Sequence, residues 1–163
     1  FQTEVIPNGP LSNVSPYKGE LIKEISKIQS QSTTHTSSIS QAAAIEALNN
    51  SDEFINKNKK IFQERRDLIF SKLKEFSQLQ VFLPQGSFYV FVCCNDLIRK
   101  KKDDGSEIKN DIDLSDYLLD EGVVVVPGEV FGCSNFFRIS FATSNENIVE
   151  GCKKIISACK KLK

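Results

Sequence analysis

The sequence contains no methionine and no tryptophan, has a single histidine, and carries no net charge. Lys plus Arg number 21 and Asp plus Glu number 21, so the basic excess typical of duplex-binding proteins is missing. No apolar run approaches the length needed to cross a bilayer, and the first residues show no signal-peptide pattern. We therefore expect a cytoplasmic protein without nucleic-acid or membrane partners. Because translation begins with methionine, we also expect that the start was removed or that the chain is part of a longer polypeptide.

The chain has five cysteines, an odd number, and they give neither a Cys-x-x-Cys pair nor the spacing of a zinc site. Cys152 and Cys159 fall on the apolar face of a helical pattern, where a free cysteine acts as a small hydrophobe. We interpret all five as reduced thiols and expect no metal site. With 163 residues, of which 40% are hydrophobic, the chain can bury the core of one domain.

The first third of the chain changes from irregular to helical. Prolines and glycines interrupt every period in residues 1–20. In residues 21–50, Leu21, Ile25 and Ile28 recur at helical spacing, and a small Ala-rich apolar face follows a run of hydroxyl and amide side chains. We expect residues 21–50 to be a helical segment, with a helix end and a loop in the polar run at residues 29–38.

A long amphipathic helix and then strands are predicted after residue 50. Asn50 and Glu53 resemble a capping box, and an apolar stripe at helical spacing follows and reaches Phe76. The period then changes from 3.6 to 2 in residues 81–83 and 88–92, which indicates strands.

The last third begins with a polar run over residues 99–110, which is typical of an exposed loop. Asp113 can cap a short helix that Gly122 ends. Strands are predicted at 123–126 and 136–141.

Thr143 and Glu146 frame the last helix as a capping box. The predicted order is therefore helix, helix, strand, helix, strand, strand, helix. This order indicates an α/β or α+β fold of two layers, with helices packed on a short sheet.

Two candidate sites are weak. His35 lies in a polar run with no nucleophile or acid at a useful spacing, so we interpret it as a surface or structural residue. Gly128 and Gly132 stand in a connection between strands and do not form a Gly-rich phosphate loop, so a nucleotide site is not predicted.

Arg138 is the stronger candidate because it interrupts an apolar strand. A guanidinium there needs a partner, since burying an unpaired charge is costly. Its planar fork matches a carboxylate through two parallel hydrogen bonds. From the pattern alone, the alternatives are an arginine that faces solvent and one that pairs with an internal Asp or Glu.

Four segments of the chain form an ordered set of motifs. They are residues 29–33 with 37–44, residues 84–89 with the pattern P-x-G-[AS]-F-Y, residues 125–132 with V-V-P-G-x-x-F-G, and residues 137–142 with F-R-[IL]-S-[YF]-A. These motifs, in this order, resemble those of the class I and II aminotransferases, and within them the bacterial aspartate aminotransferases.

The resemblance implies a C-terminal part of such an enzyme. Residues 1–20 would be an irregular remnant of the large domain's end, residues 21–50 a helical segment, and residues 51–163 the small domain with its long connecting helix. Arg138 would bind the substrate α-carboxylate. The parent reaction would be amino-group transfer between an amino acid, here aspartate, and a 2-oxo acid, with pyridoxal phosphate as cofactor.

The chain departs from the family where the cofactor lysine is expected. Val5 to Gly9 resemble the strand before that lysine, but the following S-K-x-x-x-M-T-G-W-R-x-G-Y motif is absent. Lys18 is the only lysine nearby, and its neighbours do not resemble the motif. We therefore expect no catalytic residue and no bound pyridoxal phosphate in this chain alone.

Three hypotheses remain open. The first is an aminotransferase fragment, inactive alone, that associates with itself or with a missing N-terminal portion. The second is a non-catalytic interaction or structural module derived from the small domain. The third is an autonomous enzyme that uses other residues.

Overall fold

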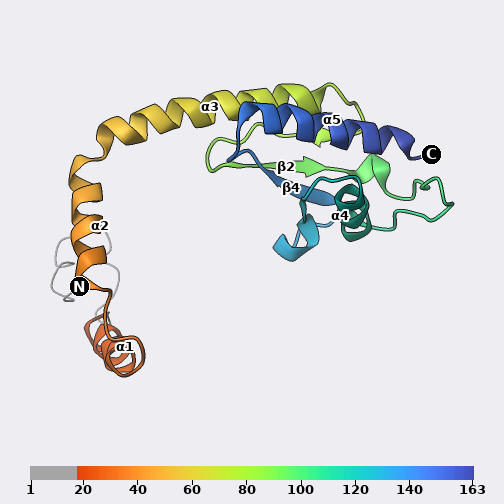
Figure 1. Ribbon diagram of the computed structural model, residues 1–163. Coiled ribbons are helices and arrows are strands. Elements are labelled where there is room, and N and C mark those ends of the chain that lie inside the picture. The colour runs from red at the N-terminus through yellow and green to blue at the C-terminus, as the bar shows by residue number, and fades with distance from the viewer. Residues whose placement is uncertain (1–17) are drawn as a thin grey trace. The chain divides into compact units, whose positions relative to one another are not determined.

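The structure is a computed structural model that describes residues 18–163 (Figure 1). The chain divides into two compact units, Phe1–Phe54 and Ile55–Lys163. Most of the predicted irregular stretch, including the strand remnant expected at Val5 to Gly9, lies outside the described residues, and its last three residues already belong to the first helix. Within residues 18–163, no helix is both long enough and apolar enough to cross a membrane.

The first unit contains helices α1 (Lys18–Ser32) and α2 (Ser38–Asn50), which confirms the helices predicted for residues 21–50. Their large apolar side chains are exposed, and no residue of α2 is buried. We call these side chains the bare apolar residues of α1 and α2: Leu21, Ile22, Ile25, Ile28, Ile39, Ile45 and Leu48.

The capping box predicted at Asn50 is wrong. Asn50 is the last residue of α2, and its side-chain amide donates to Glu46 Oε1 at 2.8 Å. Because α2 continues through Asn50, the side chain lies on a helical surface, where its neighbour is the residue four positions earlier. The next helix, α3, begins at Asp52.

The second unit is an antiparallel sheet covered by helices. The sheet has four strands in the order β1-β2-β4-β3, and each neighbouring pair is antiparallel. This confirms the prediction of helices packed on a short sheet. In chain order, the elements are α3 (Asp52–Lys74), β1 (Gln80–Val81), β2 (Tyr89–Cys93), η2 (Asn95–Leu97), α4 (Asp111–Asp120), β3 (Val126–Pro127), η3 (Gly128–Phe131), β4 (Phe136–Ser140) and α5 (Asn145–Lys161).

One face of the sheet forms the core. Side chains alternate between the two faces along a strand, so Val90 and Val92 of β2 share a face with Phe137 of β4. All three are fully buried. Helices α3 and α5 lie side by side along the sheet and contribute Leu73 and Ile155 to the same hydrophobic cluster (Figure 1). The apolar residues that recur with a period of 2 in the strands and 3.6 in the helices therefore pack into one core.

Two predicted caps are displaced along the sequence. Asn110, not Asp113, caps α4, and its side chain accepts from the Asp113 backbone N–H at 2.9 Å. Ser144, not Thr143, caps α5 and accepts from the Asn147 N–H at 3.3 Å. Neighbouring residues of the same polar type compete for a cap, and the backbone decides between them. The prediction that Gly122 ends α4 is confirmed, since Gly122 follows the helix at a φ of +81°.

The strand predicted at residues 123–126 is mostly not a strand. Val123 donates its backbone N–H to Leu118 O at 2.8 Å, which closes the end of α4, and Val124 is exposed. Only Val126 and Pro127 pair with β4. A β-branched run favours an extended backbone, but it does not supply a neighbouring strand.

The polar run of residues 99–110 is an exposed loop with one exception, since Ile108 is fully buried and belongs to the core cluster. All five cysteines are free. Three of them we call the buried cysteines: Cys94, Cys152 and Cys159.

Candidate functional site

The second face of the sheet carries Arg138. Strand pairing places Phe91 directly opposite Arg138, and Tyr89 opposite Ser140. Side chains on directly paired residues of an antiparallel ladder share a face. We call this surface the arginine face, and it carries Tyr89, Phe91, Cys93, Phe136, Arg138 and Ser140.

Arg138 is half-buried and lies against two aromatic rings. Its guanidinium carbon is 4.2 Å from the centre of the Tyr89 ring and 4.4 Å from the centre of the Phe131 ring. A cation at such distances is attracted by the negative face of the ring. Within residues 18–163, Arg138 forms no ion pair with an acidic side chain, so the internal partner considered from the sequence is not found there.

The guanidinium nitrogens of Arg138 remain open to solvent. No buried side-chain nitrogen or oxygen of the described residues lacks a hydrogen-bond partner. The side chain of Arg138 forms no hydrogen bond within that region, so its N–H groups are not sealed in the interior. The Arg138 guanidinium thus lies against two rings and keeps its N–H donors available. Such an arrangement can bind a carboxylate.

Neighbouring aromatic side chains pack against one another across the arginine face. The rings of Phe91 and Phe136 are stacked with their centres 5.1 Å apart, and the Phe131 ring meets Phe91 edge-on at 6.2 Å. Aromatic side chains have few rotatable bonds and bury a large area, so they fix a surface at a low entropic cost.

Phe131 reaches this face from the segment between β3 and β4, residues 128–135, which we call the 128–135 loop. The loop folds tightly: a Cβ on Gly128 would lie 2.2 Å from Cys133 O, and Gly132 has a φ of +72°. Both glycines are therefore required by the backbone, because no other side chain fits the first position and few tolerate the second. The P-G-x-x-F-G pattern is thus a loop that presents the phenylalanine.

Asp111 holds this loop, and the sequence pattern does not single it out. The carboxylate of Asp111 is fully buried. Its Oδ2 accepts from the Glu129 N–H at 2.9 Å, and its Oδ1 accepts from the Asn135 N–H at 3.0 Å. A carboxylate at the start of a helix looks like a helix-dipole residue in sequence, and nothing local signals its contact with a loop eighteen residues later.

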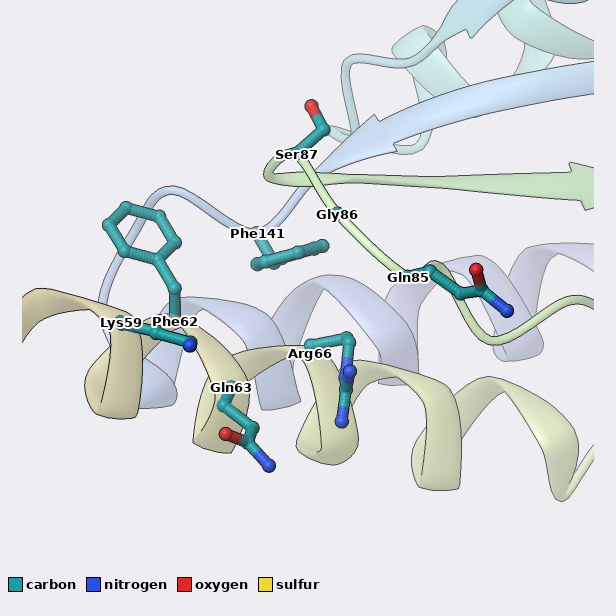
Figure 2. Close-up of a pocket in the computed structure, with 8 residues that line it drawn as sticks. All are labelled: Lys59, Phe62, Gln63, Arg66, Gln85, Gly86, Ser87 and Phe141. Atoms are coloured by element: carbon teal, nitrogen blue, oxygen red, sulfur yellow. The ribbon is translucent and has the colours of Figure 1, made fainter. Parts of the chain in front are cut away.

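A hollow lies between α3 and the 85–87 turn, away from Arg138 (Figure 2). Its volume is about 270 Å³, and Figure 2 shows the Phe141 ring between the turn and the helix. Two cations line this hollow, Lys59 and Arg66. Arg66 pairs with Asp67 at 2.7 Å and donates to Pro84 O at 3.5 Å, so it links α3 to the residue before the turn.

Other candidates do not form a site. His35 is exposed, and its Nδ1 lies 3.1 Å from Thr36 O. In the described part of the chain, no three His, Cys, Asp or Glu side chains gather where they could hold a metal ion. Burial raises the pKa of Cys94 and of Cys159 to about 12, and that of Cys152 to about 11. These thiols are therefore neutral and unreactive at ordinary pH.

The arginine face suits an anion and does not suit an aldehyde cofactor. Its polar groups are one guanidinium, one phenol, one thiol and one hydroxyl, and none of its side chains is a lysine. An aldehyde needs an amine to hold it covalently. The arginine face can orient a ligand through its carboxylate. A group that reacts with that ligand has to come from outside the arginine face.

Comparison with known proteins agrees with the motifs. The family described as "Aminotransferase class I and II" matches residues 11–155. The "Probable aspartate/prephenate aminotransferase" of Rickettsia prowazekii (strain Madrid E) is 46% identical over 143 residues, which cover 87% of this chain and 36% of the relative. The "Aspartate aminotransferase" of Rhizobium meliloti (strain 1021) is 44% identical over 144 residues, 88% of this chain and 35% of the relative.

Solved structures show the same fold. The crystal structure of the aspartate aminotransferase from Rhizobium meliloti matches with a TM-score of 0.84 and 44% identity, over 88% of this chain and 36% of that one. The Thermus thermophilus aspartate aminotransferase with maleate matches with a TM-score of 0.75 and 31% identity, over 85% of this chain and 34% of that one. The chain thus spans about a third of the length of these relatives. It belongs to the class I and II aminotransferase family.

Proposed function

We propose that this chain is the C-terminal portion of an aminotransferase that moves an amino group between aspartate and a 2-oxo acid. In this portion, Arg138 binds the α-carboxylate of the substrate. The chain is inactive by itself, because the lysine that would hold the cofactor is not among its residues. The names of the relatives support aspartate as the amino acid.

The observation that carries this proposal is the state of Arg138. Arg138 lies against the Tyr89 and Phe131 rings and has no ion pair within residues 18–163. Its N–H groups are open to solvent, so they can donate to a carboxylate. A substrate carboxylate fits that place, and the rings on either side would define its approach. The internal ion pair considered from the sequence is not found within residues 18–163, and ligand titration separates a carboxylate-binding arginine from an idle surface arginine.

Pyridoxal phosphate is the cofactor typical of this family, and it supplies the electron sink for amino-group transfer when bound. The arginine face holds no amine that could retain it. We therefore assign this chain only the binding and orientation of the substrate. The lysine, and the acid that pairs with the pyridine nitrogen, would come from a separate polypeptide or from a longer form of the same one.

A titration with maleate tests the carboxylate site directly. Maleate is a dicarboxylate named with one of the structural relatives. We expect chemical shifts of Arg138 and of the Phe131 ring to saturate with maleate in the 163-residue chain, and Arg138→Leu to abolish the effect. Arg66→Leu is the matched control, since Arg66 already contacts Asp67 and Pro84 O and lies in the hollow beside α3. Binding that disappears equally in both variants would contradict the assignment.

Complementation tests the wider proposal. A second polypeptide supplying the remaining part of the Rhizobium meliloti relative is mixed with this chain, and transamination of aspartate is followed. We expect activity from the mixture, none from either part, and none with the Arg138→Leu chain. A mixture that forms a complex but shows no activity would favour the non-catalytic module.

The bare apolar residues of α1 and α2 favour an interaction in either case. They include Ile39 and Leu48, which are each 81% exposed. Large bare patches promote association. A self-associated chain or a missing N-terminal portion would cover them.

A further inference from the structure

We propose that the buried carboxylate of Asp111 is a positioning residue for the Arg138 guanidinium, and that it acts through the 128–135 loop and the Phe131 ring. The functional meaning of this inference rests on the proposed carboxylate site. The geometry itself can be tested without any ligand.

Asp111 is the only charged side chain among the buried residues of the described region. A buried carboxylate is expensive unless hydrogen-bond donors surround it. Here both oxygens accept backbone N–H groups, from Glu129 and from Asn135. The two donors stand near the two ends of the 128–135 loop. One carboxylate on α4 therefore ties both ends of the loop to that helix, through charge-assisted hydrogen bonds.

Two hydrogen bonds within the loop fold it on itself, Gly132 N–H to Glu129 O at 2.9 Å and Cys133 N–H to Gly128 O at 3.1 Å, and the bonds to Asp111 attach this folded loop to α4. Val130 and Phe131 are 66% and 47% exposed, so little apolar burial holds its tip. Gly132 and Asn135 have φ angles of +72° and +63°. Asparagine adopts the left-handed region more readily than most residues, and its contacts fix it there. The Asn135 N–H donates to Asp111, its carbonyl accepts from the Cys94 N–H at 2.9 Å and from Cys94 Sγ at 3.1 Å, and its side-chain amide donates to Asn95 Oδ1 at 3.3 Å.

The two hydrogen bonds to Asp111 position Phe131. In the sequence, Phe131 lies between Glu129 and Asn135, the two residues whose N–H groups donate to Asp111. Of the two rings against Arg138, Tyr89 belongs to strand β2 and does not depend on the loop. Phe131 stands in the loop, and its ring also meets Phe91 of β2 at 6.2 Å. Asp111 therefore controls one of the two surfaces that orient the guanidinium.

Asp111 does not act on Arg138 by direct pairing. Both of its oxygens are directed at backbone N–H groups, and no ion pair links the two side chains. Its effect on Arg138 therefore passes through the position of the loop.

Proton resonances of the Arg138 side chain report this geometry. Protons over an aromatic ring are shifted upfield, so two rings should shift the Arg138 side-chain signals strongly in the 163-residue chain. The Arg138 resonances are identified as those that are missing from the spectrum of the Arg138→Lys chain. We expect Phe131→Leu to remove the part of the shift due to the loop, and Asp111→Asn to remove a similar part. The side-chain amide introduced by that substitution would place an NH₂ donor against one backbone N–H.

The double variant provides the decisive comparison. If Asp111 acts through Phe131, then Asp111→Asn in the Phe131→Leu chain should move the Arg138 signals no further. Asp113→Asn is the matched control, because Asp113 lies on the same helix but accepts from Lys109 N–H at 2.9 Å and does not touch the loop. It should leave the Arg138 signals unchanged.

Maleate affinity gives the second measurement. If the Phe131 ring orients the guanidinium for the ligand, Asp111→Asn and Phe131→Leu should weaken maleate binding by the same factor, because both leave the fork without that orienting surface. If the ring shifts change as expected while the unmodified chain binds no maleate, the positioning role stands and the proposed carboxylate site fails.

Three results would overturn the positioning role. The first is an Asp111→Asn chain whose Arg138 signals keep their shifts. The second is an Asp113→Asn chain whose signals move as far. The third is an Asp111→Asn chain that no longer folds, because the carboxylate would then be a general requirement of the domain.

Discussion

Replacing Arg138 by leucine should change the stability of the folded chain very little. The substitution removes two cation–π contacts, each worth about 0.5–1 kcal/mol at a partly exposed position. It leaves no buried carboxylate without its partner, because Arg138 has no ion pair within residues 18–163. Leucine also recovers apolar contact with the Tyr89 and Phe131 rings. We expect a loss of at most about 1 kcal/mol, whereas breaking a buried ion pair costs about 3–5 kcal/mol.

Asp111→Ala is the contrasting substitution. It leaves the partly buried backbone N–H groups of Glu129 and Asn135 without an acceptor, each at about 1–3 kcal/mol, so we expect a loss of at least about 2 kcal/mol. Urea unfolding followed by far-ultraviolet circular dichroism measures both variants, because the chain has no tryptophan for fluorescence. An Arg138→Leu loss of about 3 kcal/mol or more would refute the reasoning, since it would require an anionic partner inside the chain.

Gly128→Ala should destabilise the chain by more than about 2 kcal/mol in the same assay, because the added Cβ would overlap Cys133 O, whereas Gly151→Ala has open space and should stabilise helix α5 by about 0.5–1 kcal/mol. The raised pKa values of the buried cysteines predict that the stability contributed by these thiols is complete below about pH 9. Above that pH the free energy of unfolding should fall by up to about 1.4 kcal/mol per pH unit per thiol, because the unfolded thiols lose protons that the folded thiols retain. A free energy of unfolding that stays constant from about pH 8 to 10.5 would contradict this. Leu48→Lys should reduce self-association in sedimentation experiments, and a chain that is already monomeric at high concentration would remove the basis for this prediction.

Much of the fold follows from the period of the apolar residues. The stripe of α5 is visible in the sequence because Ile148, Cys152, Ile155 and Cys159 recur at helical spacing, and all four are buried. The alternation in residues 88–92 likewise separates the core face of β2 from the arginine face. Such patterns reflect interactions between neighbours in sequence, so they can be read without knowledge of the fold.

The errors occur where a distant partner decides the outcome. The β-branched run at 123–126 has a strong strand pattern, yet Val123 bonds to Leu118 and only the last residue of the run pairs with β4. Ile108 stands in a polar run and is buried by residues far from it in sequence.

The candidate site shows the same division. Arg138 is detectable because a charge in an apolar strand is unusual. Tyr89 and Phe131 are not detectable as its partners, because sheet register and loop geometry place them there. Asp111 escapes detection because its function depends on a contact across eighteen residues, with nothing distinctive in its immediate neighbours.

The edges of the sheet restrict how this chain can assemble. Both edge strands, β1 and β3, have only two residues, and β3 ends in Pro127, which has no N–H to offer. A long unpaired edge is a template for adding strands from another molecule, and short edges with proline prevent this. The sheet is therefore a poor seed for fibrils or domain-swapped ribbons. Partners that join this chain should dock through helices, so its complexes should form without any gain of β-structure.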